Sequence, residues 1–240
     1  MKTLRHVVLS ACAALVATAS LASHEEGLAA FKAGDYDRAA TLFRQVVDER
    51  PGEFASHVML GRSLLSAGRS AEAVEVADNL VGLDPGYDHL LLLGQAHLAT
   101  ETYDQAASTF RRAISADPEH WRAHFALGEV LMHQSRYRAA HKALRTALGL
   151  AVDSDEKVVW GWLGNLYWQR AQYARAEKAW KKSGQFAAAA RLRGLIPTGD
   201  LRERTRGTSE SGIREVSHPR AKGPAWLPPY GQPAPVPVDG

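Results

Sequence analysis

Cysteine is almost absent from this chain of 240 residues, since Cys12 is the only one. A single cysteine cannot form an intramolecular disulfide, and it cannot supply the several thiolates of a structural zinc or iron–sulfur site. The sequence also lacks a glycine-rich phosphate loop, a haem-attachment Cys-x-x-Cys-His motif and a Ser or Cys nucleophile motif. We therefore expect no cofactor and no catalytic residues, and we predict that the chain is not an enzyme.

A large net charge and a long apolar run are also missing. The formal net charge is only +3, which is far from the clustered basic excess of a dedicated nucleic-acid binder. No stretch approaches the ~18 consecutive apolar residues of a membrane-spanning helix. Hydrophobic residues make up 45% of the chain, enough for most of it to fold around a core. We expect neither a nucleic-acid partner nor a membrane span.

The first 22 residues have the features of a secretory signal peptide. A positively charged start precedes the apolar stretch 7–17, and small residues offer cleavage after Ala19 or, as we favour, after Ala22. The segment ending at Cys12 resembles a bacterial lipoprotein signal, but too few apolar residues precede it. We expect a cleaved signal peptide and a periplasmic protein rather than a lipoprotein anchored through Cys12.

The middle of the chain repeats one unit five times, at intervals of 33 to 36 residues. The repeat is clearest in a glycine column, which comprises Gly27, Gly61, Gly94, Gly128 and Gly164. Sixteen residues later comes a mostly large apolar column, which comprises Phe43, Ala77, Phe110, Leu144 and Trp180. Apolar residues recur at helical spacing on both sides of a short polar turn, so each unit is predicted to be a helix, a turn and a second helix. Such units must stack to bury their apolar faces.

These columns resemble the tetratricopeptide repeat family over about residues 23–190. The resemblance implies an all-α fold, a right-handed α-solenoid of about five helix-turn-helix units. A capping helix over 185–193 would complete a folded domain at 23–194. The chain departs from the pattern at Glu26, where a leucine is expected before the glycine. It departs again at Val152, which replaces a proline beside a two-residue insertion.

The resemblance also implies a concave groove lined by the first helix of each unit. The groove columns lie three residues before, one after and four after each glycine. The predicted groove residues are Phe31, Val58, Arg62, Leu65, Leu91, Gln95, Leu98, Phe125, Glu129, Met132, Asn165 and Trp168. The apolar members also suit packing between units, so both interpretations stay open. As a groove, this surface would accept an extended peptide or an amphipathic helix. The family's carboxylate clamp is disfavoured by Val58, Leu91 and Phe125 at its positions.

The C-terminal segment 195–240 differs from the repeats, because it holds eight of the chain's 11 prolines and no helical periodicity. This composition predicts a flexible, disordered tail. An alternative interpretation is a docking motif formed by Trp226, Leu227 and Tyr230, for a partner or for the chain's own groove.

Charge is divided unevenly along the repeats. Residues 23–104 hold 14 acidic and 6 basic side chains, whereas residues 105–194 hold 7 acidic and 15 basic ones. This polarity is either compositional drift or a basis for docking, including head-to-tail self-association. Among the ten histidines, His120 and His124 have a spacing that could bind a metal, but we favour core histidines and expect no metal site.

Taken together, these features predict a non-enzymatic periplasmic scaffold or adaptor for other proteins. It would help to assemble or stabilise an envelope or redox protein complex through its concave groove. One alternative is an accessory subunit of a secreted electron-transfer enzyme complex. Another is a histidine-based carrier of a metal or a small ligand.

Overall fold

The computed structural model describes residues 23–185, which form ten helices and no strands. These residues divide into two compact units, 23–116 and 117–185. The predicted all-α helical-repeat fold is therefore confirmed for this range. The predicted signal peptide 1–22, the capping helix beyond Gln185 and the tail with Trp226, Leu227 and Tyr230 lie outside the described residues.

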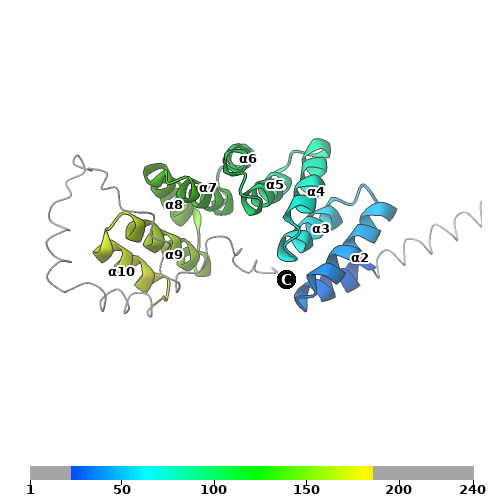
Figure 1. Ribbon diagram of the computed structural model, residues 1–240, viewed down its shortest axis with the longest axis horizontal. Coiled ribbons are helices and arrows are strands. Elements are labelled where there is room, and N and C mark those ends of the chain that lie inside the picture. Colours follow the sequence, from blue (N-terminus) through cyan, green and yellow to red (C-terminus); the bar gives the residue numbers. More distant parts are fainter. Residues whose placement is uncertain (1–22, 186–240) are drawn as a thin grey trace, which may run out of the picture. The chain divides into compact units, whose positions relative to one another are not determined.

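The first unit consists of six helices, and consecutive members of the last five are in contact. An initial helix over 23–32 is followed by α2 (Tyr36–Glu49), α3 (Phe54–Ser66), α4 (Ser70–Leu83), α5 (Tyr87–Ala99) and α6 (Tyr103–Ala116). Figure 1 shows consecutive helices of this unit running back and forth. Because α3 also contacts α5, the first helices of successive repeats lie side by side.

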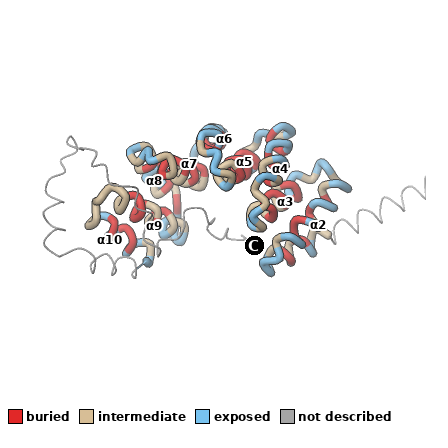
Figure 2. The backbone as a smooth tube through the Cα atoms, in the orientation of Figure 1, coloured by how far each residue is buried: buried red, intermediate tan, exposed pale blue. Residues whose placement is uncertain are grey.

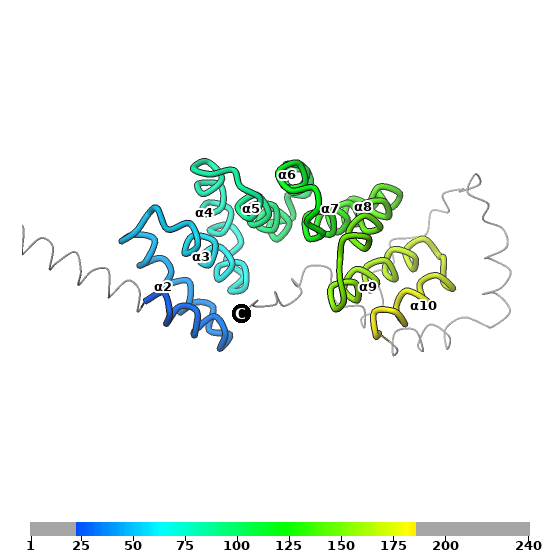
Figure 3. Tube along the Cα trace, turned by 180° about the vertical axis from the view of Figure 1, so that it is seen from behind, coloured from blue at the N-terminus to red at the C-terminus, as the bar shows by residue number. Residues whose placement is uncertain are grey.

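The second unit consists of α7 (Trp121–His133), α8 (Tyr137–Leu150), α9 (Ser154–Gln169) and α10 (Tyr173–Lys182). Helix α9 contacts α7, α8 and α10, and Figure 3 shows this unit from behind. The predicted insertion near Val152 has a visible consequence. Helix α9 has 16 residues where α3, α5 and α7 have 13, so the extra residues lengthen its N-terminal end.

Packing explains the glycine column. In four repeats the space beside the glycine is filled by the large side chain sixteen positions later. These pairs are Gly27 with Phe43, Gly94 with Phe110, Gly128 with Leu144 and Gly164 with Trp180. A Cβ atom on Gly128 would stand only 2.7 Å from Leu144. The two helices of a repeat can therefore approach closely only if this position has no side chain.

In the second repeat, a side chain from another helix fills the space beside the glycine. Its residue at the large apolar position is Ala77, which is too small to reach Gly61. Leu92, from the first helix of the next repeat, lies 2.7 Å from the position of a Cβ atom on Gly61. The glycine column is thus maintained although the residue that fills the gap comes from another helix. Figure 2 shows the buried residues gathered where the helices of one unit face one another.

Each turn within a repeat is closed by one residue in the left-handed conformation, seven positions after the glycine. The residues at this position are Gly34, Gly68, Glu101, Ser135 and Ala171. The next amide bonds back to a carbonyl in the first helix, as Arg136 N does to Leu131 O over 2.8 Å. This arrangement is a Schellman cap, which ends the first helix and reverses the chain.

Candidate functional site

In the first unit, the predicted groove residues lie on the initial helix, α3 and α5. Val58 and Leu65 on α3 and Gln95 and Leu98 on α5 are partly buried, whereas Leu91 is only 5% exposed. Leu91 therefore belongs to the core of this unit. Gln95 and Leu98 lie on the face of α5 beside Gly94, where the polar side chain of Gln95 makes no hydrogen bond within the described residues.

The other two groove residues of this unit are Phe31 and Arg62. Phe31 packs edge-on against Tyr36, with 5.3 Å between the ring centroids. Arg62 is partly buried on α3, one position after Gly61. The predicted columns thus form a face of mixed character, with apolar side chains around two polar ones. Whether this face binds a partner stays a prediction.

In the second unit, three of the predicted groove residues on α7 and α9 have contacts that hold the fold together. Met132 on α7 is only 5% exposed and lies in the hydrophobic core formed with α8 and α9. Asn165 on α9 is 9% exposed, and its Oδ1 accepts a 3.1 Å hydrogen bond from the indole Nε1 of Trp180. Trp168 packs against Tyr173 and Trp180 with ring centroids 5.2 Å and 6.0 Å away.

Two tryptophans beside the predicted columns were not identified from the sequence. Phe125 lies edge-on between Trp121, at 5.7 Å, and Trp162 of α9, at 5.8 Å. All three rings are partly buried, so they form an aromatic row on the surface of α7 and α9. The spacing of Trp121 and Phe125, one helical turn apart, could have indicated this row. Trp162 falls two positions before its glycine, in a column without aromatic neighbours in the other repeats.

Glu129 is the most unusual ionisable group on this face. It follows Gly128 on α7, is partly buried and makes no hydrogen bond or ion pair within the described residues. Burial raises the pKa of its carboxyl to about 7, because the charged form loses hydration and gains no partner. A carboxyl in this state can accept a hydrogen bond from a donor group of a bound molecule, or form an ion pair with a cation of that molecule.

The histidines near the predicted groove have identifiable structural contacts. His57 Nδ1 lies 3.1 Å from the carbonyl of Glu53, and His89 Nδ1 lies 2.8 Å from that of Asp84. His124 Nε2 lies 2.9 Å from the carbonyl of Pro118. Each imidazole thus ties the start of a first helix to the preceding loop. Within the part of the chain that the structure describes, no group of three or more His, Cys, Asp or Glu side chains could hold a metal ion.

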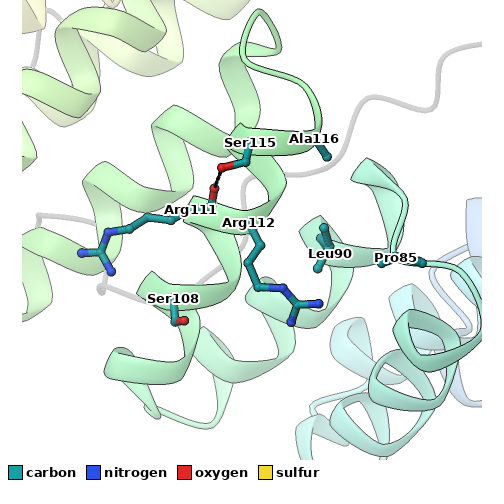
Figure 4. A pocket seen from close by; sticks show the side chains of 7 residues that line it. All are labelled: Pro85, Leu90, Ser108, Arg111, Arg112, Ser115 and Ala116. Carbon is teal, nitrogen blue, oxygen red and sulfur yellow. Dashed lines mark hydrogen bonds between the residues drawn. The ribbon is translucent and has the colours of Figure 1, made fainter.

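A shallow hollow of about 510 Å³ lies on α5 and α6, separate from the predicted columns. Arg112 extends toward Leu90 and Pro85, while Arg111 points to the other side of α6 (Figure 4). The Ser115 hydroxyl donates to the carbonyl of Arg111 over 3.0 Å, so it is satisfied locally. No predicted groove residue lines this hollow.

A few charged side chains on α2 and α4 form ion pairs with one another. Arg69 bonds to Glu72 at 2.7 Å and reaches Asp37 at 3.4 Å, which connects α4 with α2. The hydrogen bond from Arg69 lowers the pKa of Glu72. These pairs are exposed, so they contribute little to stability. Head-to-tail association through such charges stays a prediction.

Every helix within residues 23–185 is too short or too polar to span a lipid bilayer.

Sequence comparisons agree with the fold. The family model described as "Tetratricopeptide repeat" matches residues 24–88 and 91–155. Lipopolysaccharide assembly protein B of Escherichia coli K12 is 25% identical over 134 residues, which are 53% of this chain and 34% of that protein. Heat shock protein STI1 of Saccharomyces cerevisiae is 30% identical over 122 residues, which are 48% of this chain and 20% of that protein. The chain thus spans about a third or less of the length of these relatives.

Solved structures show the same arrangement of helices. The thermophilic tetratricopeptide repeat protein TTC0263 of Thermus thermophilus aligns with a TM-score of 0.62 at 23% identity, covering 78% of this chain and 97% of that one. MamA from Desulfovibrio magneticus RS-1 aligns with a TM-score of 0.56 at 17% identity, covering 72% and 96%. At these identities the likeness concerns the fold alone.

Proposed function

Because the chain belongs to the tetratricopeptide repeat family, we propose that it is a non-enzymatic scaffold that holds a segment of another protein against the first helices of its repeats. One observation carries this proposal. Gln95 and Glu129 occupy the same column of consecutive repeats, are partly buried, and make no hydrogen bond or ion pair within the described residues. Burial disfavours the charged form of Glu129, and a bound segment would supply hydrogen-bond partners to both side chains.

The bound segment is an extended peptide or an amphipathic helix. Leu65 and Leu98 in the first unit and Phe125 in the second offer partly buried apolar surface beside the polar column. A segment with alternating apolar and polar side chains matches such a face within either unit, since its apolar groups fill the surface and its polar groups meet Gln95 in the first unit or Glu129 in the second. Specificity would come from the polar column and affinity from the apolar one.

We place this scaffold in the periplasm, where it helps to assemble an envelope complex. Two observations support this part of the proposal. Residues 1–22 have the composition of a secretory signal peptide. The relative from Escherichia coli is named as a lipopolysaccharide assembly protein, and it is similar over about half of this chain.

Two matched leucine substitutions test the proposal. Leu98→Glu places a charge in the predicted groove, whereas Leu83→Glu changes an outward leucine of α4 that is 66% exposed. Tagged wild-type and variant chains would be used to capture proteins from a periplasmic extract of the native host, after circular dichroism has confirmed that each is folded. We expect Leu83→Glu to retain the wild-type partner and Leu98→Glu to retain at least about tenfold less of it. Full retention by folded Leu98→Glu would contradict the proposal.

A further inference from the structure

The second unit carries a group of four arginines that the predicted groove does not use. Arg138 and Arg145 lie on α8, Arg170 follows the last residue of α9, and Arg175 lies in the first turn of α10. We call these four residues the arginine cluster. They come from three successive elements, so the fold rather than the local sequence brings them together.

The centre of the arginine cluster is the contact between His141 and Tyr167. His141 lies on the same face of α8 as Arg138 and Arg145, three residues after one and four before the other. Its Nε2 is 3.1 Å from the Tyr167 hydroxyl, and the two rings are 5.7 Å apart, which fixes the end of α9 against α8. The left-handed residue Ala171 then turns the chain between Arg170, at the end of α9, and Arg175, in the first turn of α10.

The charges of the arginine cluster act on one another. Burial lowers the pKa of His141, and the positive charges of Arg170, Arg145 and Arg175 lower it further. Burial also lowers the pKa of Arg170, with added effects from Arg138 and Arg175. Charges that influence one another in this way are close in space. Arg145, Arg170 and Arg175 are therefore near His141, and Arg138 and Arg175 are near Arg170, so the cluster includes residues from more than one helix.

Carboxylates that could neutralise the arginine cluster are missing from α8, from the end of α9 and from the free groups of α10. Helix α7, which also packs against α8, carries Glu129, but no arginine contributes to the pKa shift of that carboxyl. Helix α8 contains no Asp or Glu, and α9 has its two acidic residues in its first turn, at the far end from Arg170. The one carboxylate of α10, Glu177, pairs with Lys181 at 2.7 Å. Within the described residues, Arg138, Arg145 and Arg170 make no hydrogen bond or ion pair, and Arg175 donates only to Gln172 at 3.3 Å.

We propose that the arginine cluster is a binding site for a phosphate group. Guanidinium groups present paired N–H donors that match the oxygens of phosphate, and their mutual repulsion is offset when a dianion lies between them. The hydroxyl of Tyr167 and the imidazole of His141 add polar contacts at the centre. A compact dianion fits converging charges better than an acidic helix, whose carboxylates are spread along its length. Free phosphate compounds and the phosphate headgroups of lipids share this chemistry.

The test compares two matched double variants of the full chain. The variant Arg145→Gln with Arg175→Gln removes two charges from the arginine cluster. The control variant Arg111→Gln with Arg112→Gln removes two charges from exposed positions of α6 in the first unit. Titration calorimetry with pyrophosphate measures binding of a free phosphate compound. Sedimentation with phosphatidylcholine vesicles, with and without phosphatidic acid, measures binding of a lipid phosphate headgroup. All these arginines are exposed, so neither double variant should unfold the chain.

In whichever of the two measurements the wild type binds, we expect the cluster variant to lose at least about tenfold in affinity. The α6 variant should stay within about twofold of the wild-type affinity. Binding in the calorimetric arm alone assigns a soluble phosphate compound, and binding to phosphatidic acid vesicles assigns a lipid headgroup. The proposal is overturned if wild type binds in neither arm or if both double variants weaken binding equally. It is also overturned if a poly-glutamate peptide binds as tightly as pyrophosphate.

Discussion

The ring of Phe110 occupies the space in which a Cβ atom on Gly94 would stand, so helices α5 and α6 meet at a position without a side chain. Phe110 is fully buried, and it cannot move aside without opening the core of the first unit. The same relationship joins Gly164 with Trp180 in the second unit. Each pair fixes how closely the two helices of a repeat approach.

Replacing Gly94 by alanine should therefore destabilise the protein by about 1–3 kcal/mol, because the added methyl group overpacks a closed site. Gly82→Ala on α4 is the matched control, since its Cβ would meet no atom within 4 Å. This control should raise stability by up to about 1 kcal/mol, as alanine favours helix more than glycine does. Urea denaturation measures both. Equal effects at the two positions would refute this explanation of the glycine column.

The hydrogen bond between Trp180 and Asn165 gives a second prediction. Asn165→Leu leaves the buried indole N–H without its acceptor and should cost about 1–3 kcal/mol of unfolding free energy. Gln95→Leu removes an amide from the same column of an earlier repeat, where no hydrogen bond is lost within the described residues. Thermal unfolding should show a lower midpoint for the first variant only. A comparable drop of the midpoint for both variants would contradict the claim that Asn165 stabilises the fold through this hydrogen bond.

Glu129 should make the second unit less stable at high pH. Its carboxyl has a pKa of about 7 in the folded chain against 4.5 for an unperturbed glutamate, so the folded state holds the proton more tightly. The stabilisation that this proton provides is complete below pH 4.5 and is lost as the pH rises through 7. Glu129→Gln should therefore be more stable than wild type at about pH 8, by at most about 3 kcal/mol, and similar to it at about pH 4.

Denaturant titrations at the two pH values measure this difference. Glu119→Gln, which changes an exposed carboxyl of the same unit, is the control for the loss of one negative charge. If Glu129→Gln gave the same gain under the acidic condition as under the alkaline one, the carboxyl would not be desolvated in the way described.

The arginine cluster makes a prediction for His141. The pKa of this imidazole is lowered first by burial and then by the charges of Arg170, Arg145 and Arg175. The double variant Arg145→Gln with Arg175→Gln should raise the pKa of His141, but not to the unperturbed value of 6.5, because burial remains. Histidine chemical shifts followed by NMR from about pH 4 to about pH 8 measure the change. An unchanged titration would show that the arginines lie too far away to act on the ring.

Much of the fold could be predicted from the sequence, because repetition multiplies the signal of each column. The glycines and the residues sixteen positions later were aligned without coordinates, and four of the five pairs are in contact. The exception shows the limit of the alignment. Nothing in the second repeat indicates that Leu92 would reach back to fill the space beside Gly61, since this contact depends on how neighbouring repeats stack.

The candidate site was less predictable, because a column gives the position of a residue but not its contacts. Met132 and Leu91 share their columns with partly exposed residues but are buried in the core. The amide oxygen of Asn165 is occupied by Trp180, a residue fifteen positions away. The arginine cluster could not be inferred either, since its members lie on α8, just after α9 and on α10, and they come near one another only when those helices pack.

Site-specific crosslinking most directly tests the claim that the first helices hold a partner. A photo-reactive amino acid would replace Gln95 or Glu129 in the polar column, and the exposed Gln45 or Lys178 on second helices, in cells that make the full chain. The account predicts that Gln95 and Glu129 give crosslinks to the same protein and that Gln45 and Lys178 give none to it. Crosslinks to that protein from the second helices alone, or equally from all four positions, would contradict it.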